Sequence, residues 1–105
     1  MFSFHQSEDA LNIKIESKRL DVTNASRLRE QFEEQVHMKV NKASVDLSQI
    51  EFIDSSGVGV LLGIQKKIGK GHTPIILKNP QAAVLSIIEL LRLNRVFDIN
   101  QDLKK

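Results

Sequence analysis

The apolar residues of this chain alternate between a spacing of two and a spacing of three to four, and this alternation limits the folds that the chain can adopt. Residues 1–16 alternate apolar and polar side chains around a polar turn at residues 7–9, which predicts a hairpin of two strands. Residues 25–36 then carry apolar side chains at helical spacing, and Asp21 or Thr23 can cap that helix. The first part of the chain therefore predicts two strands followed by a helix.

The rest of the chain continues this alternation of strands and helices. Val45–Ile53 predicts one buried central strand, and a second helix is expected to begin at Ser56. Pro74–Leu77 predicts the next strand, Pro80 suits the first turn of a third helix, and residues 96–99 predict a short final strand. This order predicts an α/β fold with a mixed, mostly parallel β-sheet flanked by α-helices.

The length and composition of the chain indicate a single globular domain. A chain of 105 residues has room for one hydrophobic core, so we expect one domain over residues 1–105, with residues 100–105 as a frayed tail. With 41% hydrophobic and 27% charged residues, the chain can bury enough apolar surface to fold. The core is expected to include an apolar set drawn from the predicted strands and helices: Ile50, Phe52, Leu61, Ile64, Ile76, Val84, Ile87 and Leu91.

Composition also excludes several classes of function. The chain has no cysteine, so it has no disulfide, thiolate metal site or cysteine nucleophile. A net charge of +2 is too small to indicate a nucleic-acid partner. No aromatic residues interleave the basic residues, which favours a solvated face for Lys66, Lys67, Lys70 and Lys78.

The chain also lacks the sequence features of secretion and membrane insertion. Its start has neither the basic nor the apolar region of a signal peptide. The uncharged stretch over residues 55–65 is far shorter than the roughly 20 residues of a membrane span. We therefore expect a cytoplasmic protein without membrane insertion.

The most unusual segment is Asp54–Gly59, where a predicted strand gives way to a predicted helix. Reactive groups and ligands gather at the carboxyl ends of parallel strands, because the next helix presents free N–H groups there. Gly57 and Gly59 would let another backbone or a phosphate approach closely. The same residues also suit a purely structural role, in which Asp54 and the serines cap the helix and the glycines let it pack closely on the sheet. The residues alone therefore leave both a functional site and a structural role open.

The residues of the chain do not have the spacing that the common enzyme motifs require. A dinucleotide fingerprint would need glycine where Leu62 stands, and Gly63 comes one position late. Neither a phosphate-binding loop nor the glycine–serine elbow of hydrolases is present. The three histidines lack the spacing of a metal site and are expected to be exposed: His5, His37 and His72. The sequence thus predicts no catalytic residue, no metal and no cofactor.

Val45–Gly63 closely resembles the signature of bacterial anti-sigma-factor antagonists, which are small STAS domains (sulphate transporter and anti-sigma factor antagonist). Leu20–Ala25 resembles the loop that leads into the first helix of this family. Further matches lie in the family's closing helix and last strand: Asn79-Pro80, Val84, Leu91 and Val96-Phe97. The chain departs from the family at Lys18, where many members have glycine, and in a reduced or missing C-terminal helix.

The resemblance implies a binding module that is controlled by phosphorylation. The family's phosphorylated serine corresponds to Ser55, with Asp54 directly before it and Asp21 at an acidic position beside it. The implied partners are a serine kinase with a histidine-kinase-like ATPase fold, which is also an anti-sigma factor, and a serine phosphatase. The kinase partner is expected to supply ATP, the metal ion and the base.

We expect this partner to dock on a surface formed by the Asp21–Asn24 loop, Asp54 to Gly59 and the exposed side of the helix that follows. Its expected residues are Asp21, Thr23, Asn24, Asp54, Ser55, Ser56, Gly57, Val58 and Gly59. Within this set we expect Ser56 to cap the helix through its hydroxyl group. We expect a monomer when the chain is free. Two other functions stay open: an accessory subunit of a lipid-transport ATPase or a stressosome-like scaffold, and a stand-alone nucleotide hydrolase.

Overall fold

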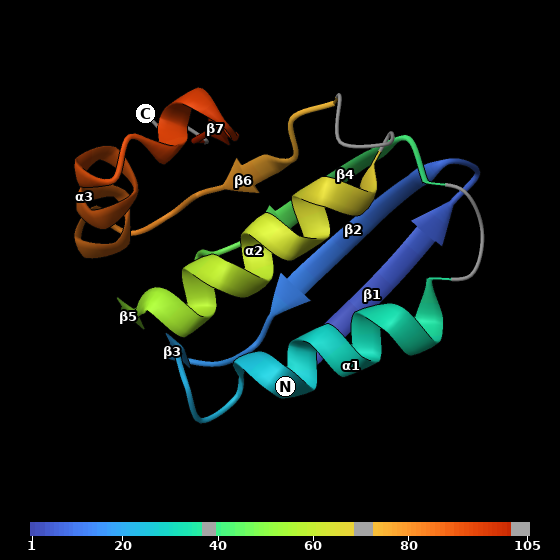
Figure 1. The fold of residues 1–105 in the computed structure, drawn as a ribbon, viewed down its shortest axis with the longest axis horizontal. Coiled ribbons are helices and arrows are strands. Elements are labelled where there is room, and N and C mark those ends of the chain that lie inside the picture. The colour runs from blue at the N-terminus through green and yellow to red at the C-terminus, as the bar shows by residue number, and fades with distance from the viewer. Residues whose placement is uncertain (37–39, 69–72, 102–105) are drawn as a thin grey trace.

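A five-stranded sheet forms the centre of the fold in the computed structural model, which describes residues 1–36, 40–68 and 73–101 (Figure 1). The strand order is β1-β2-β4-β6-β7, with β1 antiparallel to β2 and every other neighbouring pair parallel. The strands are β1 (Phe2–Ser7), β2 (Ala10–Ile15), β4 (Lys42–Asp46), β6 (Ile76–Lys78) and β7 (Asp98–Asn100). The predicted hairpin and the mixed, mostly parallel sheet are both confirmed.

Two helices, α1 (Ala25–Gln35) and α2 (Ser55–Lys67), run side by side over one face of this sheet (Figure 1). Each helix buries its apolar stripe against the sheet: Leu28 and Phe32 from α1, and Leu61 and Ile64 from α2. A third helix, α3 (Ala82–Leu90), contacts β5, and the short 3₁₀ helix η2 (Leu93–Arg95) follows it and contacts β7. No helix of the described part is long and apolar enough to cross a membrane.

The prediction of one continuous strand over Val45–Ile53 is wrong, because the chain turns after Asp46. The backbone N–H of Ser48 donates to Asp46 Oδ1 (2.9 Å), and that of Ile50 donates to the Leu47 carbonyl (3.0 Å). The chain then forms a separate short strand, β5 (Phe52–Ile53), which pairs in parallel with β3 (Arg19–Leu20). This two-stranded sheet determines where α2 begins.

The predicted core is confirmed at half of its positions. Ile50, Leu61, Ile64 and Val84 are buried, and Ile76 and Ile87 are half-buried.

The core prediction is wrong at Phe52 and Leu91. Phe52 is 47% exposed because it points to the opposite face of its strand from the buried Ile53, and the Arg19 guanidinium lies over its ring at 5.6 Å from the ring centroid. Leu91 is 52% exposed because α3 ends there and the chain turns through a left-handed residue, Arg92 (φ 59°).

Some predictions concern residues at the limits of the described part. Asn100, which we assigned to the tail, belongs to β7, and residues 102–105 of that tail lie outside the described residues. His37, Lys70 and His72 also lie outside them.

Candidate functional site

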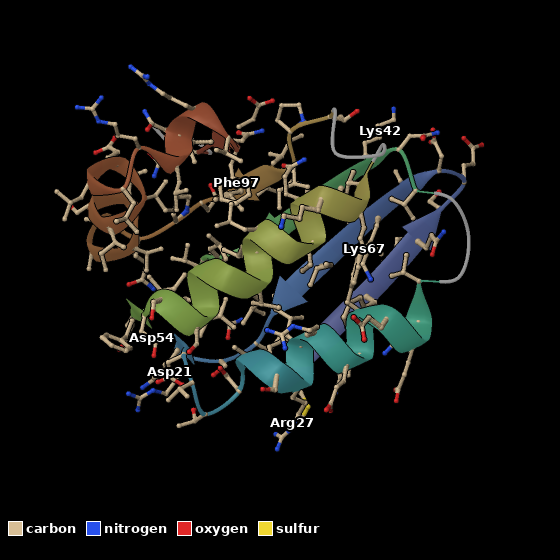
Figure 2. The ribbon with its side chains drawn as sticks, viewed as in Figure 1. Asp21, Arg27, Lys42, Asp54, Lys67 and Phe97 are labelled. Atoms are coloured by element: carbon tan, nitrogen blue, oxygen red, sulfur yellow. The ribbon has the colours of Figure 1, made fainter. Side chains whose placement is uncertain are left out.

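The small sheet of β3 and β5 brings two distant segments together. In its parallel register, Leu20 lies opposite Ile53, so the residues that follow these strands, Asp21 and Asp54, emerge from the same end. Figure 2 shows these two carboxylates near the first turn of α2. The loop at residues 21–24 and the amino end of α2 therefore form one surface.

Asp54 holds the two segments in place with both of its carboxylate oxygens. Its Oδ1 accepts from the backbone N–H of Gly57 at 3.1 Å, and its Oδ2 accepts from that of Val22 at 3.1 Å. Asp54 therefore caps α2 and ties the loop to it. The prediction that Ser56 caps this helix is wrong, because the aspartate already occupies the capping position and Ser56 is the second residue of the helix.

Ser55 is the first residue of α2 and its side chain is exposed, whereas Ser56 is half-buried. Neither serine hydroxyl forms a hydrogen bond within residues 1–36, 40–68 and 73–101. Ser55 thus presents a hydroxyl group to solvent at the positive end of a 13-residue helix.

Asp21 organises the loop from the inside. It is only 3% exposed; its Oδ1 accepts from the backbone N–H and the hydroxyl of Thr23, and its Oδ2 accepts from Arg19 Nε at 2.6 Å. The Thr23 hydroxyl, with help from the Thr23 amide and Arg19, holds the pKa of this carboxyl below its usual 3.8, although burial acts in the opposite direction. Asp21 therefore anchors the loop, and its carboxylate is turned away from solvent.

Asn24 completes the loop and caps α1, although its side chain bonds to the loop rather than to the helix. Its Oδ1 accepts from the backbone N–H of Asp21 at 3.0 Å, and its Nδ2 donates to the Arg19 carbonyl at 2.8 Å. The structure thus assigns helix capping to a residue other than Asp21 or Thr23, the two predicted from sequence. Asp21 and Asn24 together fix the path of the loop.

Gly57 and Gly59 have different environments on the same helix. A Cβ atom on Gly57 would lie 2.3 Å from the Leu20 carbonyl oxygen, so only glycine lets α2 pack this closely on β3. Gly59 is exposed and a Cβ there would meet no atom within 4 Å. Val58, between them, is buried at 8% exposure, so its side chain belongs to the core.

Two exposed apolar side chains beside this surface were missed by the sequence analysis. Val22 is 71% exposed on the loop, and Phe52 is 47% exposed just before Asp54. A single apolar residue in a polar loop gives no periodic signal, and the apolar neighbours of Phe52 made it resemble a core residue. Both add apolar area near Ser55.

The described residues contain no cluster of three or more histidine, aspartate or glutamate side chains that could hold a metal ion. The polar groups of the site instead hydrogen-bond one another and leave one exposed serine hydroxyl. This arrangement suits recognition or modification by another protein.

Comparison with known proteins supports the same view. The family model for the STAS domain matches residues 2–105. A candidate anti-sigma-factor antagonist of Thermotoga maritima is 30% identical over 100 residues, which cover 94% of this chain and 88% of that protein. The structure of the anti-sigma-factor antagonist SpoIIAA in its unphosphorylated form is 20% identical, with a TM-score of 0.80 over 99% of this chain and 90% of that one.

The Bacillus cell fate determinant SpoIIAA in its phosphorylated form has a TM-score of 0.73 at 19% identity, over 99% of this chain and 93% of that one. At these identities, the two SpoIIAA structures show the fold. The chain therefore belongs to the STAS domain family, and its 30% identity to the Thermotoga maritima protein relates it to the anti-sigma-factor antagonists within that family.

Proposed function

We propose that this protein is an anti-sigma-factor antagonist that acts by partner switching. In its unphosphorylated form it binds an anti-sigma factor that is also a serine kinase with a histidine-kinase-like ATPase fold. Phosphorylation of Ser55 ends this binding, and a serine phosphatase restores it. The observation that carries the proposal is the exposed Ser55 hydroxyl at the amino end of α2, which has no hydrogen-bond partner among the described residues and follows a carboxylate that is fixed in place.

Exposure favours Ser55 over Ser56 as the phosphorylated residue, since a kinase must reach the hydroxyl oxygen. In the reaction, Ser55 Oγ attacks the γ-phosphorus of ATP, ADP leaves, and a base of the partner takes the hydroxyl proton. Asp54 accepts one backbone hydrogen bond on each carboxylate oxygen, and we assign to it the role of fixing the backbone around Ser55 and to the partner the role of the base. The catalytic groups therefore all belong to the partner.

The fold is expected to tolerate the phosphate. A phosphoserine adds about −1.5 to −2 charges, and the positive end of the α2 dipole stabilises negative charge near Ser55. SpoIIAA, whose fold this chain shares, has been solved in both its unphosphorylated and phosphorylated forms, which supports this expectation. Phosphorylation would therefore change binding without unfolding the domain.

A phosphate on Ser55 would lower the affinity for the partner, because it would lie within the contact between the two proteins. We define the Ser55 surface as the exposed side chains of Val22, Thr23 and Ser55 together with Gly59. A partner that packs on Val22 and over Gly59 would exclude water from Ser55, and a buried phosphate beside Asp54 would lose its solvation and meet a like charge. This cost is the proposed switch.

Asp21 contributes indirectly, because its carboxylate faces the loop and not solvent. Asp21→Ala would free Thr23 and Arg19 and so loosen the loop that carries Val22. We therefore expect weaker partner binding from Asp21→Ala in a domain that remains folded.

The test begins with capture of the partner from native lysate by the wild type, Ser55→Ala and Ser55→Asp, followed by calorimetric titration of the purified partner. Ser55→Ala should bind and stay bound when ATP is added. Ser55→Asp should bind at least tenfold more weakly, or about 1.4 kcal/mol. Ser26→Asp is the matched control, because it places the same charge on an exposed serine in the first turn of α1 and should bind normally.

Equal affinity of the partner for unmodified and Ser55-phosphorylated protein would refute the switch. A STAS accessory or scaffold subunit would then be the better hypothesis. Intact-mass analysis after kinase treatment identifies the site: Ser56→Ala should gain one phosphate, and a phosphate retained on Ser55→Ala would show that the assignment is wrong.

A further inference from the structure

Arg19, the first residue of β3, contacts both segments that meet at the candidate site. Its Nε donates to Asp21 Oδ2 at 2.6 Å, and its guanidinium lies over the ring of Phe52, at 5.6 Å from the ring centroid. Arg19 and Phe52 are also opposite each other in the register of β3 and β5. One side chain therefore links the loop at residues 21–24 to the strand that leads into α2.

The contact with Asp21 satisfies a carboxylate oxygen that is hidden from water. Asp21 is buried, and its Oδ1 is occupied by the amide and hydroxyl groups of Thr23. Among the described residues, Oδ2 accepts a hydrogen bond from Arg19 alone. A buried carboxylate oxygen without a donor is costly, so the loop would have to rearrange to hydrate this oxygen if the Arg19 side chain were lost.

Hydrogen bonds, more than packing, fix the position of the loop. Val22 is 71% exposed, so apolar contacts contribute little to its placement. Its N–H donates to Asp54 Oδ2 at 3.1 Å, and the next N–H, that of Thr23, donates to Asp21 Oδ1 at 3.0 Å. The second bond requires the present orientation of the Asp21 carboxylate. A change at Arg19 would therefore be transmitted to the residues that the Ser55 surface presents.

The chemistry of arginine suits this linking role. Its Nε lies in the plane of the guanidinium, so one rigid group can donate to a carboxylate with its edge and lie over an aromatic ring with its face. A lysine ammonium has no such face and is more strongly hydrated. The Arg19 side chain is 59% exposed, and ion pairs at such positions add little to global stability. We therefore expect its loss to alter the loop and leave the fold intact.

We infer that Arg19 is a positioning residue of the Ser55 surface. It holds Asp21, and through Asp21 the loop, against β5, so that Val22 and Thr23 lie where the partner contacts them. The effect of Arg19 on the partner rests on the proposed function, whereas its effect on the loop concerns this chain alone.

The first test is amide hydrogen exchange of the free ¹⁵N-labelled protein, measured by NMR. In Arg19→Gln, the amides of Val22 and Thr23 should exchange at least tenfold faster than in the wild type, and Arg19→Lys should give intermediate rates. The amides of β4 should keep their wild-type rates. Arg27→Gln is the matched control, because Arg27 is an exposed arginine of α1 without an ion pair in the described part of the chain. Its loop should exchange like the wild type.

The second test uses the purified partner. In calorimetric titration, Arg19→Gln should lower the affinity about tenfold and Arg27→Gln should not change it. The reacting groups belong to Ser55 and the partner, so Arg19→Gln should raise the KM for phosphorylation and leave kcat unchanged.

Wild-type exchange in the loop of Arg19→Gln would refute the inference, and so would faster loop exchange with an unchanged affinity. An equal acceleration of the β4 amides would show a loss of global stability instead of a positioning role. Weaker binding without faster exchange would show that Arg19 contacts the partner directly, and the positioning role would be wrong. If phosphorylated and unmodified protein bind the partner equally while Arg19→Gln loosens the loop and weakens binding, the switch is wrong and the role of Arg19 stands.

Discussion

Replacing Gly57 by alanine should destabilise this domain, although alanine is the better helix former. The new Cβ would lie 2.3 Å from the Leu20 carbonyl oxygen and 2.8 Å from Ile53 Cγ1. Unstrained contacts between carbon and oxygen are about 3.3 Å or longer, so α2 must move about 1 Å away from β3. Leu20 is fully buried and its carbonyl also accepts from the Asp54 N–H, so it cannot move instead.

The expected size of the effect follows from opposing contributions. Overpacking costs about 1–3 kcal/mol, and weakening the long hydrogen bond (3.4 Å) between the Asp54 N–H and the Leu20 carbonyl adds less than about 1 kcal/mol. Replacing a helical glycine by alanine restores about 0.5–1 kcal/mol. The free energy of unfolding should therefore fall by about 1–3 kcal/mol, a large share of the stability of a small domain.

Two other glycines of α2 provide matched controls for this experiment. A Cβ on Gly59 or Gly63 would meet no atom within 4 Å, so Gly59→Ala and Gly63→Ala should each raise stability by about 0.5–1 kcal/mol. Urea unfolding followed by circular dichroism compares all three variants with the wild type. If Gly57→Ala stabilised the protein as Gly59→Ala does, the close packing of α2 on β3 would be refuted.

Three further predictions concern stability. Asp54→Ala removes the side chain that caps α2, so it should lower the free energy of unfolding in urea by about 1–2 kcal/mol. Ser56→Ala should change it by less than about 0.5 kcal/mol. A larger effect of Ser56→Ala than of Asp54→Ala would show that Ser56 is the capping residue. The pKa of Asp21 is lower in the folded chain, so its stabilisation is complete above the unfolded-state pKa of 3.8 and is lost as pH falls through the folded-state value. Asp21→Asn should therefore flatten the acid limb of the plot of stability against pH, and an unchanged limb would contradict the assigned contacts. Arg92 has a left-handed backbone (φ 59°), so Arg92→Gly should raise stability by about 1 kcal/mol, and a lower melting temperature would count against strain at this turn.

Local patterns were enough to predict much of the fold. The period-two hairpin over residues 1–16, the helices that carry Leu28 and Leu61, and the order of strands and helices are all signals within short windows of sequence. The Asp54–Gly59 segment was likewise recognised as unusual because its position between a strand and a helix is a local property. Patterns of this kind are reliable because each element must bury one face.

The path of the backbone that leads to Ser55 follows only from the tertiary structure. The sequence could not show that the chain turns after Asp46, because the apolar run over Val45–Ile53 suits one strand as well as two. After the local turn at residues 46–50, Glu51 N–H donates to the carbonyl of Lys18 at 2.6 Å, a residue far away in the sequence, and the chain goes on to pair with β3.

The pairing of β3 with β5 leaves Phe52 at an exposed edge and turns Asp21 inward. It also brings the Val22 N–H onto Asp54 Oδ2, while Oδ1 of the same carboxylate caps α2 through a local hydrogen bond from the Gly57 N–H. The residue types at this site could be read locally, but their roles depend on contacts between distant segments, which hydrophobic periodicity does not encode.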